Sequence, residues 1–204
     1  MEAFTPALDR LSNHSDHLAV LGTSFGAEAA LLLGTIDTRI DTTAALAPTS
    51  VVWATPDHDD QERPIAASKW TQAGRGLPFV EYIDQTTPHR SVLDNALAVH
   101  QASLEHNQAQ IAAATIPVEN IRGRVLVAAG GADRVWPSTL FAHQIADRRA
   151  KAGLETTNCC THRPATAPFC PARNPHHCAP TSPRGGTPRQ TQNTAPRSSR
   201  NFSS

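Results

Sequence analysis

Apolar residues along the first third of the chain gather in short runs that are separated by polar turns. Thr5–Leu11 is typical of a short helix, with a proline near its first position. His17–Leu21 is a brief apolar run of the kind found in buried strands. Ala27–Leu33, rich in Ala and Leu, predicts a helix that ends at Gly34, and Ile40–Leu46 indicates the next strand.

The alternation resumes after a long polar excursion. Residues 53–90 are interrupted by Pro, Asp and Gly and predict little regular structure. Residues 93–114 keep apolar side chains on one helical face, and 124–129 form the clearest strand of the chain. Residues 138–152 predict a helix, and 154–157 begin a last strand. Strands alternating with helices predict an α/β fold, a mostly parallel sheet with flanking helices.

Composition divides the chain near residue 157. Residues 1–157 contain all 18 acidic side chains and 12 of the 18 basic ones. Residues 158–204 contain six arginines, eight of the 16 prolines and all four cysteines, but no Leu, Ile, Val or Met. A segment without aliphatic side chains cannot build a packed core. We therefore expect one folded domain over residues 1–157 and a disordered Pro/Arg/Cys-rich tail over residues 158–204.

The overall charge and the longest apolar runs exclude several classes of protein. The formal net charge is zero, which gives no reason to expect a nucleic acid as partner. No apolar run approaches the roughly 20 residues of a membrane span. The N-terminus lacks the basic start and apolar core of a signal peptide, so we expect a cytoplasmic protein. The sequence leaves the oligomeric state open.

Cysteine and histidine residues in the last segment raise the question of a zinc site. Their spacing does not match two pairs of ligands two to four residues apart. We therefore expect no metal and no cofactor. The residues concerned are Cys159, Cys160, Cys170, Cys178, His162, His176 and His177.

The segment Gly22–Gly26 reads Gly-Thr-Ser-Phe-Gly between a predicted strand and a predicted helix. This is the G-x-S-x-G pattern of a nucleophile elbow, a strained turn that holds a serine hydroxyl above the sheet. The two glycines give room where strand and helix nearly touch. We predict Ser24 as a nucleophile and the Phe25 amide as an oxyanion donor. The alternative is an ordinary turn flanked by glycines.

A nucleophilic serine needs an orienting acid and a base, which follow it in that order in this architecture. Asp133 stands just after the strand at 124–129 and is the candidate acid, although it could instead be a turn residue that pairs with Arg134. His162 is the first histidine after the last predicted strand and is the candidate base, with a solvated tail histidine as the alternative.

Other histidines and the tryptophans are open to more than one interpretation. We expect His89, His100, His106 and His143 on the surface or on helix faces. His143 follows the loop of Asp133 closely enough to be tested as a substitute base. The three tryptophans line either an acyl pocket above Ser24 or the core. They are Trp53, Trp70 and Trp136.

Four blocks of sequence, taken in order, point to a family. They are Gly22–Glu28, Ala47–Trp53, Trp70-Thr71 with Gly76–Pro78, and Gly130–Ser138. Together they resemble the C-terminal catalytic domain of acyl-CoA thioester hydrolases and bile acid-CoA:amino acid N-acyltransferases, an α/β-hydrolase related to dienelactone hydrolases. The resemblance covers residues 3–157. It implies Ser24 as nucleophile, Asp133 as acid, an acyl-CoA thioester as substrate and an acyl-enzyme, with no metal or bound cofactor.

The chain departs from this family at both ends. Only about 20 residues precede Ser24, where an α/β-hydrolase has several strands and a loop with the second oxyanion amide. The family's Gly-His segment is replaced after residue 157 by a sequence typical of a shifted reading frame, with a genuine tail as the alternative. We therefore expect a partial α/β-hydrolase fold, an exposed edge strand at Leu18–Leu21 and little activity.

Three functions stay open. The first is a serine acyl hydrolase of the acyl-CoA thioesterase type. The second is a non-catalytic, truncated fragment of such an enzyme, and the third is a carboxylesterase or dienelactone-hydrolase-like enzyme. The residues indicate neither the length of the acyl chain nor whether the acyl group passes to water or to an amine.

Overall fold

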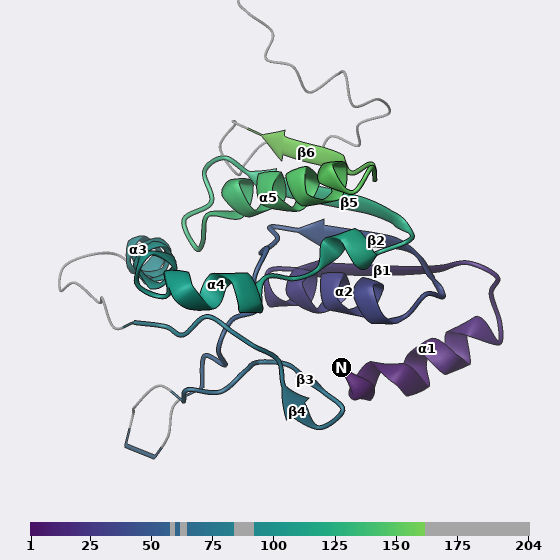
Figure 1. Cartoon of the computed structure of the whole chain (residues 1–204), viewed down its shortest axis with the longest axis horizontal. Coiled ribbons are helices and arrows are strands. Elements are labelled where there is room, and N and C mark those ends of the chain that lie inside the picture. Colours follow the sequence, from purple (N-terminus) through teal and green to yellow (C-terminus); the bar gives the residue numbers. More distant parts are fainter. Residues whose placement is uncertain (58–59, 62–64, 84–91, 162–204) are drawn as a thin grey trace, which may run out of the picture.

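A four-stranded parallel sheet forms the centre of the computed structural model, which describes residues 1–57, 60–61, 65–83 and 92–161 (Figure 1). The strand order is β1-β2-β5-β6, and all three strand pairs are parallel. The α/β fold, a mostly parallel sheet with flanking helices, is therefore confirmed. The strands are β1 (Leu18–Thr23), β2 (Ile40–Leu46), β5 (Arg124–Gly130) and β6 (Thr157–Thr161).

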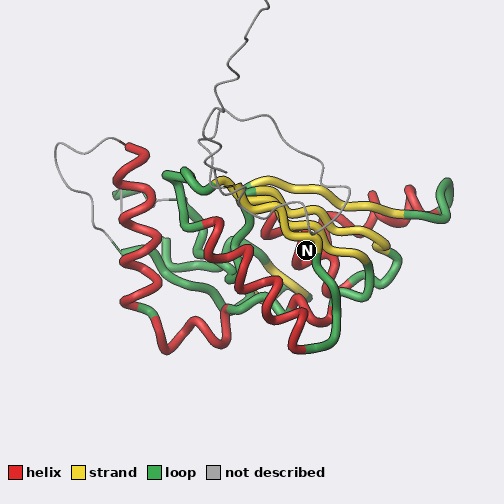
Figure 2. Tube along the Cα trace, turned by 90° about the horizontal axis from the view of Figure 1, so that it is seen from above, coloured by secondary structure: helices red, strands yellow, loops and turns green. Residues whose placement is uncertain are grey.

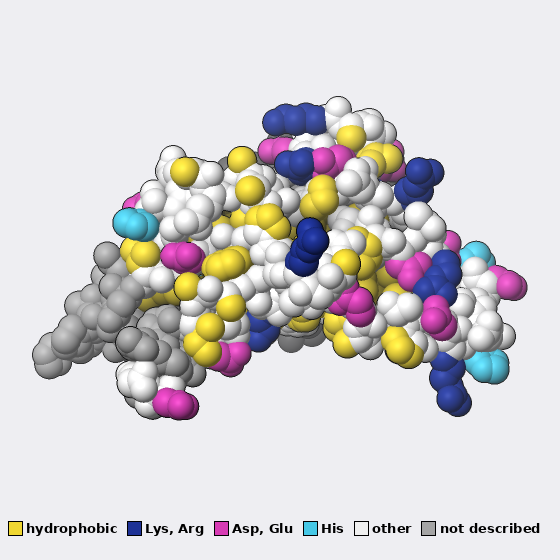
Figure 3. Space-filling view, turned by 60° about the horizontal axis from the view of Figure 1, so that its bottom comes forward, with side chains coloured by type: hydrophobic (Ala, Val, Ile, Leu, Met, Phe, Trp, Pro, Cys, Tyr) yellow, Lys and Arg dark blue, Asp and Glu magenta, His cyan; other side chains and the backbone are white. Residues whose placement is uncertain are grey.

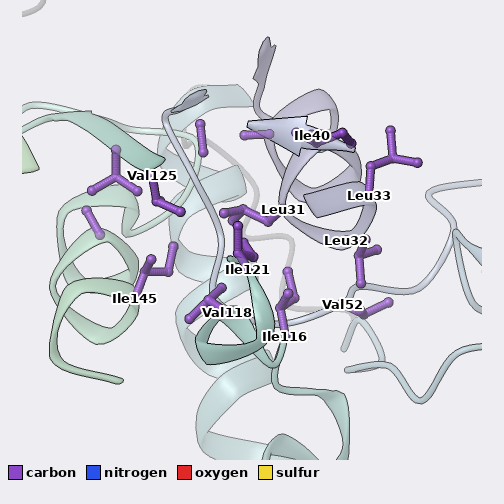
Figure 4. Packing of buried hydrophobic residues seen from close by; sticks show 14 of the residues in the cluster. Leu31, Leu32, Leu33, Ile40, Val52, Ile116, Val118, Ile121, Val125 and Ile145 are labelled. Carbon is purple, nitrogen blue, oxygen red and sulfur yellow. The ribbon is translucent and has the colours of Figure 1, made fainter. Parts of the chain in front are cut away.

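Two helices cover one face of this sheet (Figures 1 and 2). Helix α2 (Phe25–Ile36) packs on β1 and β2, and α5 (Ser138–Lys151) packs on β5 and β6. Both contact the short 3-10 helix η2 (Val118–Asn120), so they lie on the same side. Side chains from all of these elements form one buried cluster. Figure 4 shows Leu31, Val118 and Ile121 near its middle, with Val125 and Ile145 on the α5 side.

The side chains of β1 that point away from this cluster are exposed. Leu21 is 68% exposed, and Ala19 and Thr23 on the same face are exposed as well. Within the described residues β1 pairs with β2 alone, so it is an edge strand. The prediction of an exposed edge strand at this position is confirmed. A parallel sheet is ordinarily covered on both faces, which makes Leu21 unusual in its exposure.

The long excursion between β2 and β5 contains a short hairpin and two α-helices. A two-stranded antiparallel hairpin joins β3 (Thr71–Gln72) to β4 (Arg75–Gly76). The single helix predicted over 93–114 is two helices, α3 (Val92–His106) and α4 (Gln108–Ala114). Asn107 separates them, because its side-chain amide donates to the carbonyls of Ser103 (2.9 Å) and Glu81 (3.0 Å). The chain begins with η1 (Glu2–Phe4) and α1 (Thr5–Ser12).

Strand β6 lies further along the chain than the apolar pattern predicts. The pattern places it at Leu154–Thr157, whereas it runs from Thr157 to Thr161 and pairs with β5 throughout. Backbone hydrogen bonds to a neighbouring strand do not require aliphatic side chains, so the pattern misses it. Cys159 is buried and Cys160 packs against the core cluster. Residues 162–204, most of the segment expected as a tail, lie outside the described residues.

Arg149 connects η2 to the segments that precede β5 and β6 through hydrogen bonds to their backbone carbonyls. Its side chain is on α5 and is 2% exposed. The guanidinium donates to the carbonyls of Val118 and Ile121 (2.8 Å each), and further donors reach Gly123 and Glu155 at 3.2–3.3 Å. One buried cation thus satisfies backbone groups of η2 and of the segments that lead into β5 and β6.

The surface and the helices give two further observations. On the face in Figure 3, basic side chains lie beside acidic ones at the upper and right edges instead of forming a patch of one sign. None of the helices over the described residues has the length and apolar character that a membrane span requires.

Candidate active site

Ser24 sits in a strained backbone conformation between β1 and α2. Its φ is 57° and its ψ is −125°, a combination that costs a non-glycine residue about 1–3 kcal/mol. The turn is held from both sides. The Ser24 amide donates to the carbonyl of Leu46 on β2 at 3.0 Å, and the Ser24 carbonyl accepts from the amides of Ala27 and Glu28 at 2.9 and 3.2 Å. This is the strand–turn–helix context that the G-x-S-x-G pattern predicts.

Only one of the two glycines in the pattern is required by space. A Cβ atom at Gly22 would lie 1.8 Å from the carbonyl oxygen of Gly26, so strand and helix touch there. A Cβ atom at Gly26 would have no atom within 4 Å. The expectation that both glycines give room is therefore wrong for Gly26, because its α-carbon faces open space.

The groups next to Ser24 are available for chemistry. Phe25 is the first residue of α2, and its amide has no backbone acceptor among the described residues. The Ser24 side chain is half-buried and makes no hydrogen bond to any described residue. An amide at the positive end of a helix, beside an unengaged hydroxyl, is what a nucleophile and its oxyanion donor need.

Asp133 forms the turn that follows β5. Its Oδ1 accepts hydrogen bonds from the amides of Val135 (2.9 Å) and Trp136 (3.4 Å), and its own amide donates to Gly130 (3.1 Å). Its Oδ2 has no hydrogen-bond partner in the described part of the chain. The side chain is half-buried. One oxygen therefore fixes the orientation of the carboxyl group while the other can still accept a proton donor.

The loops of Ser24 and Asp133 leave the same edge of the sheet. The register aligns Thr23 with Leu46 and Leu46 with Ala128, so β1 and β5 end together, one strand apart. Two neighbour spacings of ~4.8 Å separate these strands by roughly 10 Å. The rings of Phe25 and Trp136 meet edge to face between the two loops, with centroids 5.6 Å apart.

The histidines differ in how the structure places them. The candidate base His162 lies outside the described residues. His143 is exposed on α5. His100 is 9% exposed and meets the rings of Trp53 and Trp136 edge to face, with centroids at 4.9 and 5.5 Å. His100 therefore belongs to the buried face of α3 rather than to the surface.

The His100 imidazole interacts with backbone groups of α3 and of the loop that contains Asp133. Its Nδ1 lies 2.7 Å from the Ala96 carbonyl. Burial lowers the pKa of His100, while the backbone groups of Ala96 and Val135 and the charge of Asp133 act in the opposite direction. A neutral imidazole in these surroundings holds α3 against the Asp133 loop. The position of His100 on a helix face is as expected, whereas its contacts with Trp53 and Trp136 were not predicted.

The tryptophans support the core interpretation. Trp53 and Trp136 are 0% and 1% exposed and belong to a second buried cluster with Val51, Val80 and Phe141. Trp70 is half-buried against the main cluster. A cavity of about 570 Å³ lies elsewhere, between residues of α4, η2 and α5, and neither Ser24 nor Asp133 lines it.

Glu28 is a buried acid that sequence reasoning missed. It lies on α2, four residues after Ser24, and is 0% exposed. Its Oε1 accepts hydrogen bonds from the Trp53 amide (3.1 Å) and from Trp70 Nε1 (2.9 Å). Burial raises the pKa of Glu28 to about 8. The signal in the sequence was a single acidic residue inside the apolar run Ala27–Leu33.

Comparison with known proteins gives one match. The sequence model of the family described as BAAT / acyl-CoA thioester hydrolase C terminal matches residues 1–189. The match extends past residue 157, where we expected the resemblance to end, and takes in part of the segment expected as a tail. No curated protein matches the chain.

Proposed function

Because the chain belongs to the BAAT / acyl-CoA thioester hydrolase C-terminal family, we propose that it is a serine acyl hydrolase of the acyl-CoA thioesterase type. The proposed nucleophile is Ser24. The observation that carries this proposal is the backbone conformation of Ser24, with a φ of 57° at a turn locked between β2 and α2. A strained non-glycine residue at such a turn is retained where its side chain has a task.

The proposed reaction proceeds in two steps. The Ser24 hydroxyl attacks the thioester carbonyl carbon, a base takes its proton, and the Phe25 amide stabilises the negative charge on the carbonyl oxygen. The carbon–sulfur bond then breaks, and the thiol leaves with the proton from the base. Water, activated by the same base, attacks the acyl-enzyme, which releases the carboxylic acid and restores Ser24. Asp133 orients the base and stabilises its cation.

His162 is the proposed base, and the rate of the whole cycle depends on it. We expect slow turnover, because Phe25 is the single oxyanion donor that we identify and one such donor is worth about 10²–10³ in kcat. Acylation needs only the first half of the cycle. Acylation and hydrolysis of the acyl-enzyme are both expected to be slow, because the same base and the same oxyanion donor serve both steps.

Release of free thiol from acyl-CoA substrates of several chain lengths tests the proposal. We expect release to disappear in Ser24→Ala, to fall strongly in His162→Ala and to be unchanged in His143→Ala. Loss in His143→Ala would place the base on α5 instead. Hydrolysis of the matching oxygen ester without the thioester would indicate a carboxylesterase, and no acylation of any substrate would favour the non-catalytic alternative.

A further inference from the structure

The Glu28 carboxyl group joins the elbow helix to two points of the excursion between β2 and α3. Its Oε1 accepts hydrogen bonds from the backbone amide of Trp53 and from the indole N–H of Trp70. Its Oε2 has no hydrogen-bond partner among the described residues. Trp53 and Trp70 are 17 residues apart in the chain. A single side chain on α2 therefore holds two points of this excursion, Trp53 and Trp70.

Lys69 is connected to both anchor points. Its amide donates to the Trp53 carbonyl at 3.2 Å, and its neighbour Trp70 is the residue bound by Glu28. The Lys69 side chain is half-buried and crosses to Phe25, where Nζ lies 4.9 Å from the ring centroid. It has no ion pair with an acidic group in the described part of the chain. The anchored segment thus places a cation against the residue that follows Ser24.

A cation at this position bears on the chemistry of the elbow. An oxyanion forming at the Phe25 amide meets the positive end of α2. A lysine whose ammonium group lies over the Phe25 ring adds to that positive potential. Lys69 depends on the anchor for this, because the cation–π contact alone is weak at a half-exposed site.

We propose that Glu28 is a positioning residue, which holds Trp53 and Trp70 against α2 and thereby keeps Lys69 against Phe25, where it favours acylation of Ser24. The effect on acylation rests on the proposed function, whereas the effect on the segment does not. Burial keeps the carboxyl group mostly protonated at neutral pH. The ionisable groups that interact with Glu28 are Lys69 and Tyr82.

Four variants test this. Glu28→Leu removes the acceptor, Glu28→Gln keeps an acceptor of the same shape, Trp70→Phe removes one donor, and Lys69→Met removes the cation alone. Exposed Glu105 on α3 provides the control, Glu105→Leu. Hydrogen exchange of the Trp53 and Lys69 amides reports on the segment, and the rate of Ser24 labelling by a fluorophosphonate probe reports on the elbow.

We expect exchange at both amides to be about 5- to 150-fold faster in Glu28→Leu and intermediate in Trp70→Phe, since a hydrogen bond to a buried group is lost. Glu28→Gln and Glu105→Leu should behave as the wild type. Lys69→Met should slow labelling without changing exchange. Unchanged exchange in Glu28→Leu and Trp70→Phe overturns the anchoring role. Faster exchange with wild-type labelling, or normal labelling of Lys69→Met, overturns the link to the elbow.

Absence of Ser24 labelling in the wild type would contradict the proposed function and the link to acylation. The exchange comparison would still decide whether Glu28 holds the segment. The two failures are therefore distinguishable, because one is read from a covalent label and the other from backbone amides.

Discussion

A side chain at Gly22 would collide with the backbone of Gly26, since a Cβ atom there would lie 1.8 Å from the Gly26 carbonyl oxygen. The strand that leads to Ser24 and the helix that leaves it are thus in contact at the elbow. No flexible side chain is available to move aside, because the group that a Cβ would meet is backbone. This contact separates the structural requirements of two glycines that look equivalent in the sequence.

We predict that Gly22→Ala distorts the elbow and lowers the free energy of unfolding by several kcal/mol, in the range of the most disruptive single substitutions, roughly 4 kcal/mol or more. Gly26→Ala is the matched control. It adds a methyl group in open space within α2 and should be neutral or stabilise by up to about 1 kcal/mol. Thermal and urea unfolding of both variants measure this. Equal effects of the two substitutions would contradict the contact at Gly22.

Glu28 makes the stability of the protein depend on pH. Its pKa is raised in the folded state to about 8 from a usual value near 4.5. Between these values the unfolded chain holds fewer protons than the folded one, so the free energy of unfolding falls as pH rises from about 5 to 8. The full shift corresponds to about 5 kcal/mol at most. Urea unfolding should show this fall in the wild type and lose it in Glu28→Gln. Parallel pH profiles would mean that the carboxyl group is ionised in the folded state.

Arg149 and Arg148 are neighbours on α5 with very different expected contributions. Arg149→Met leaves the buried Ile121 carbonyl without its donor, removes the guanidinium bond to the Val118 carbonyl, and should destabilise by about 3 kcal/mol or more. Arg148 forms an ion pair with Glu119 at the surface, and Arg148→Met should cost about 0–1 kcal/mol. The difference in melting temperature between the two variants measures this. A larger loss in Arg148→Met would contradict the assignment of Arg149 as the anchor.

Asp133→Asn should separate a catalytic role from a structural one. The amide oxygen of Asn can still accept from the Val135 and Trp136 amides, so the turn and the melting temperature should be preserved. Loss of the charge should lower kcat by about 10⁴, as for the acid of serine-protease triads. Thiol release from acyl-CoA provides the rate. A variant with wild-type turnover would show that the acid lies elsewhere.

The strands and helices of the sheet were predictable where apolar side chains repeat with a clear period. The runs at Ile40–Leu46 and at 124–129 predict β2 and β5 to within one residue. The apolar pattern places strand β6 about three residues too early. The residues that form it, Thr157–Thr161, carry no aliphatic side chain and are held by backbone pairing with β5. The break between α3 and α4 depends on the contact of Asn107 with the distant Glu81, which no local pattern contains.

The residues of the candidate site also differ in how far the sequence predicts them. Ser24, Phe25 and Asp133 lie in local motifs next to predicted strands, and the structure places all three at one edge of the sheet. The contacts of Glu28 and His100 could not be predicted from the sequence, because their partners come from the irregular excursion or from another loop. A buried polar side chain is recognised by what surrounds it, and here the surroundings are tertiary.

Labelling of Ser24 tests the central claim most directly. The protein is incubated with a fluorophosphonate probe, digested, and examined by mass spectrometry for the modified peptide, beside Ser24→Ala and, as the matched control in the same turn, Thr23→Ala. We predict a single modification on Ser24 in the wild type and in Thr23→Ala, and none in Ser24→Ala. Labelling that persists in Ser24→Ala, or a wild-type protein that remains unmodified, would contradict Ser24 as the nucleophile.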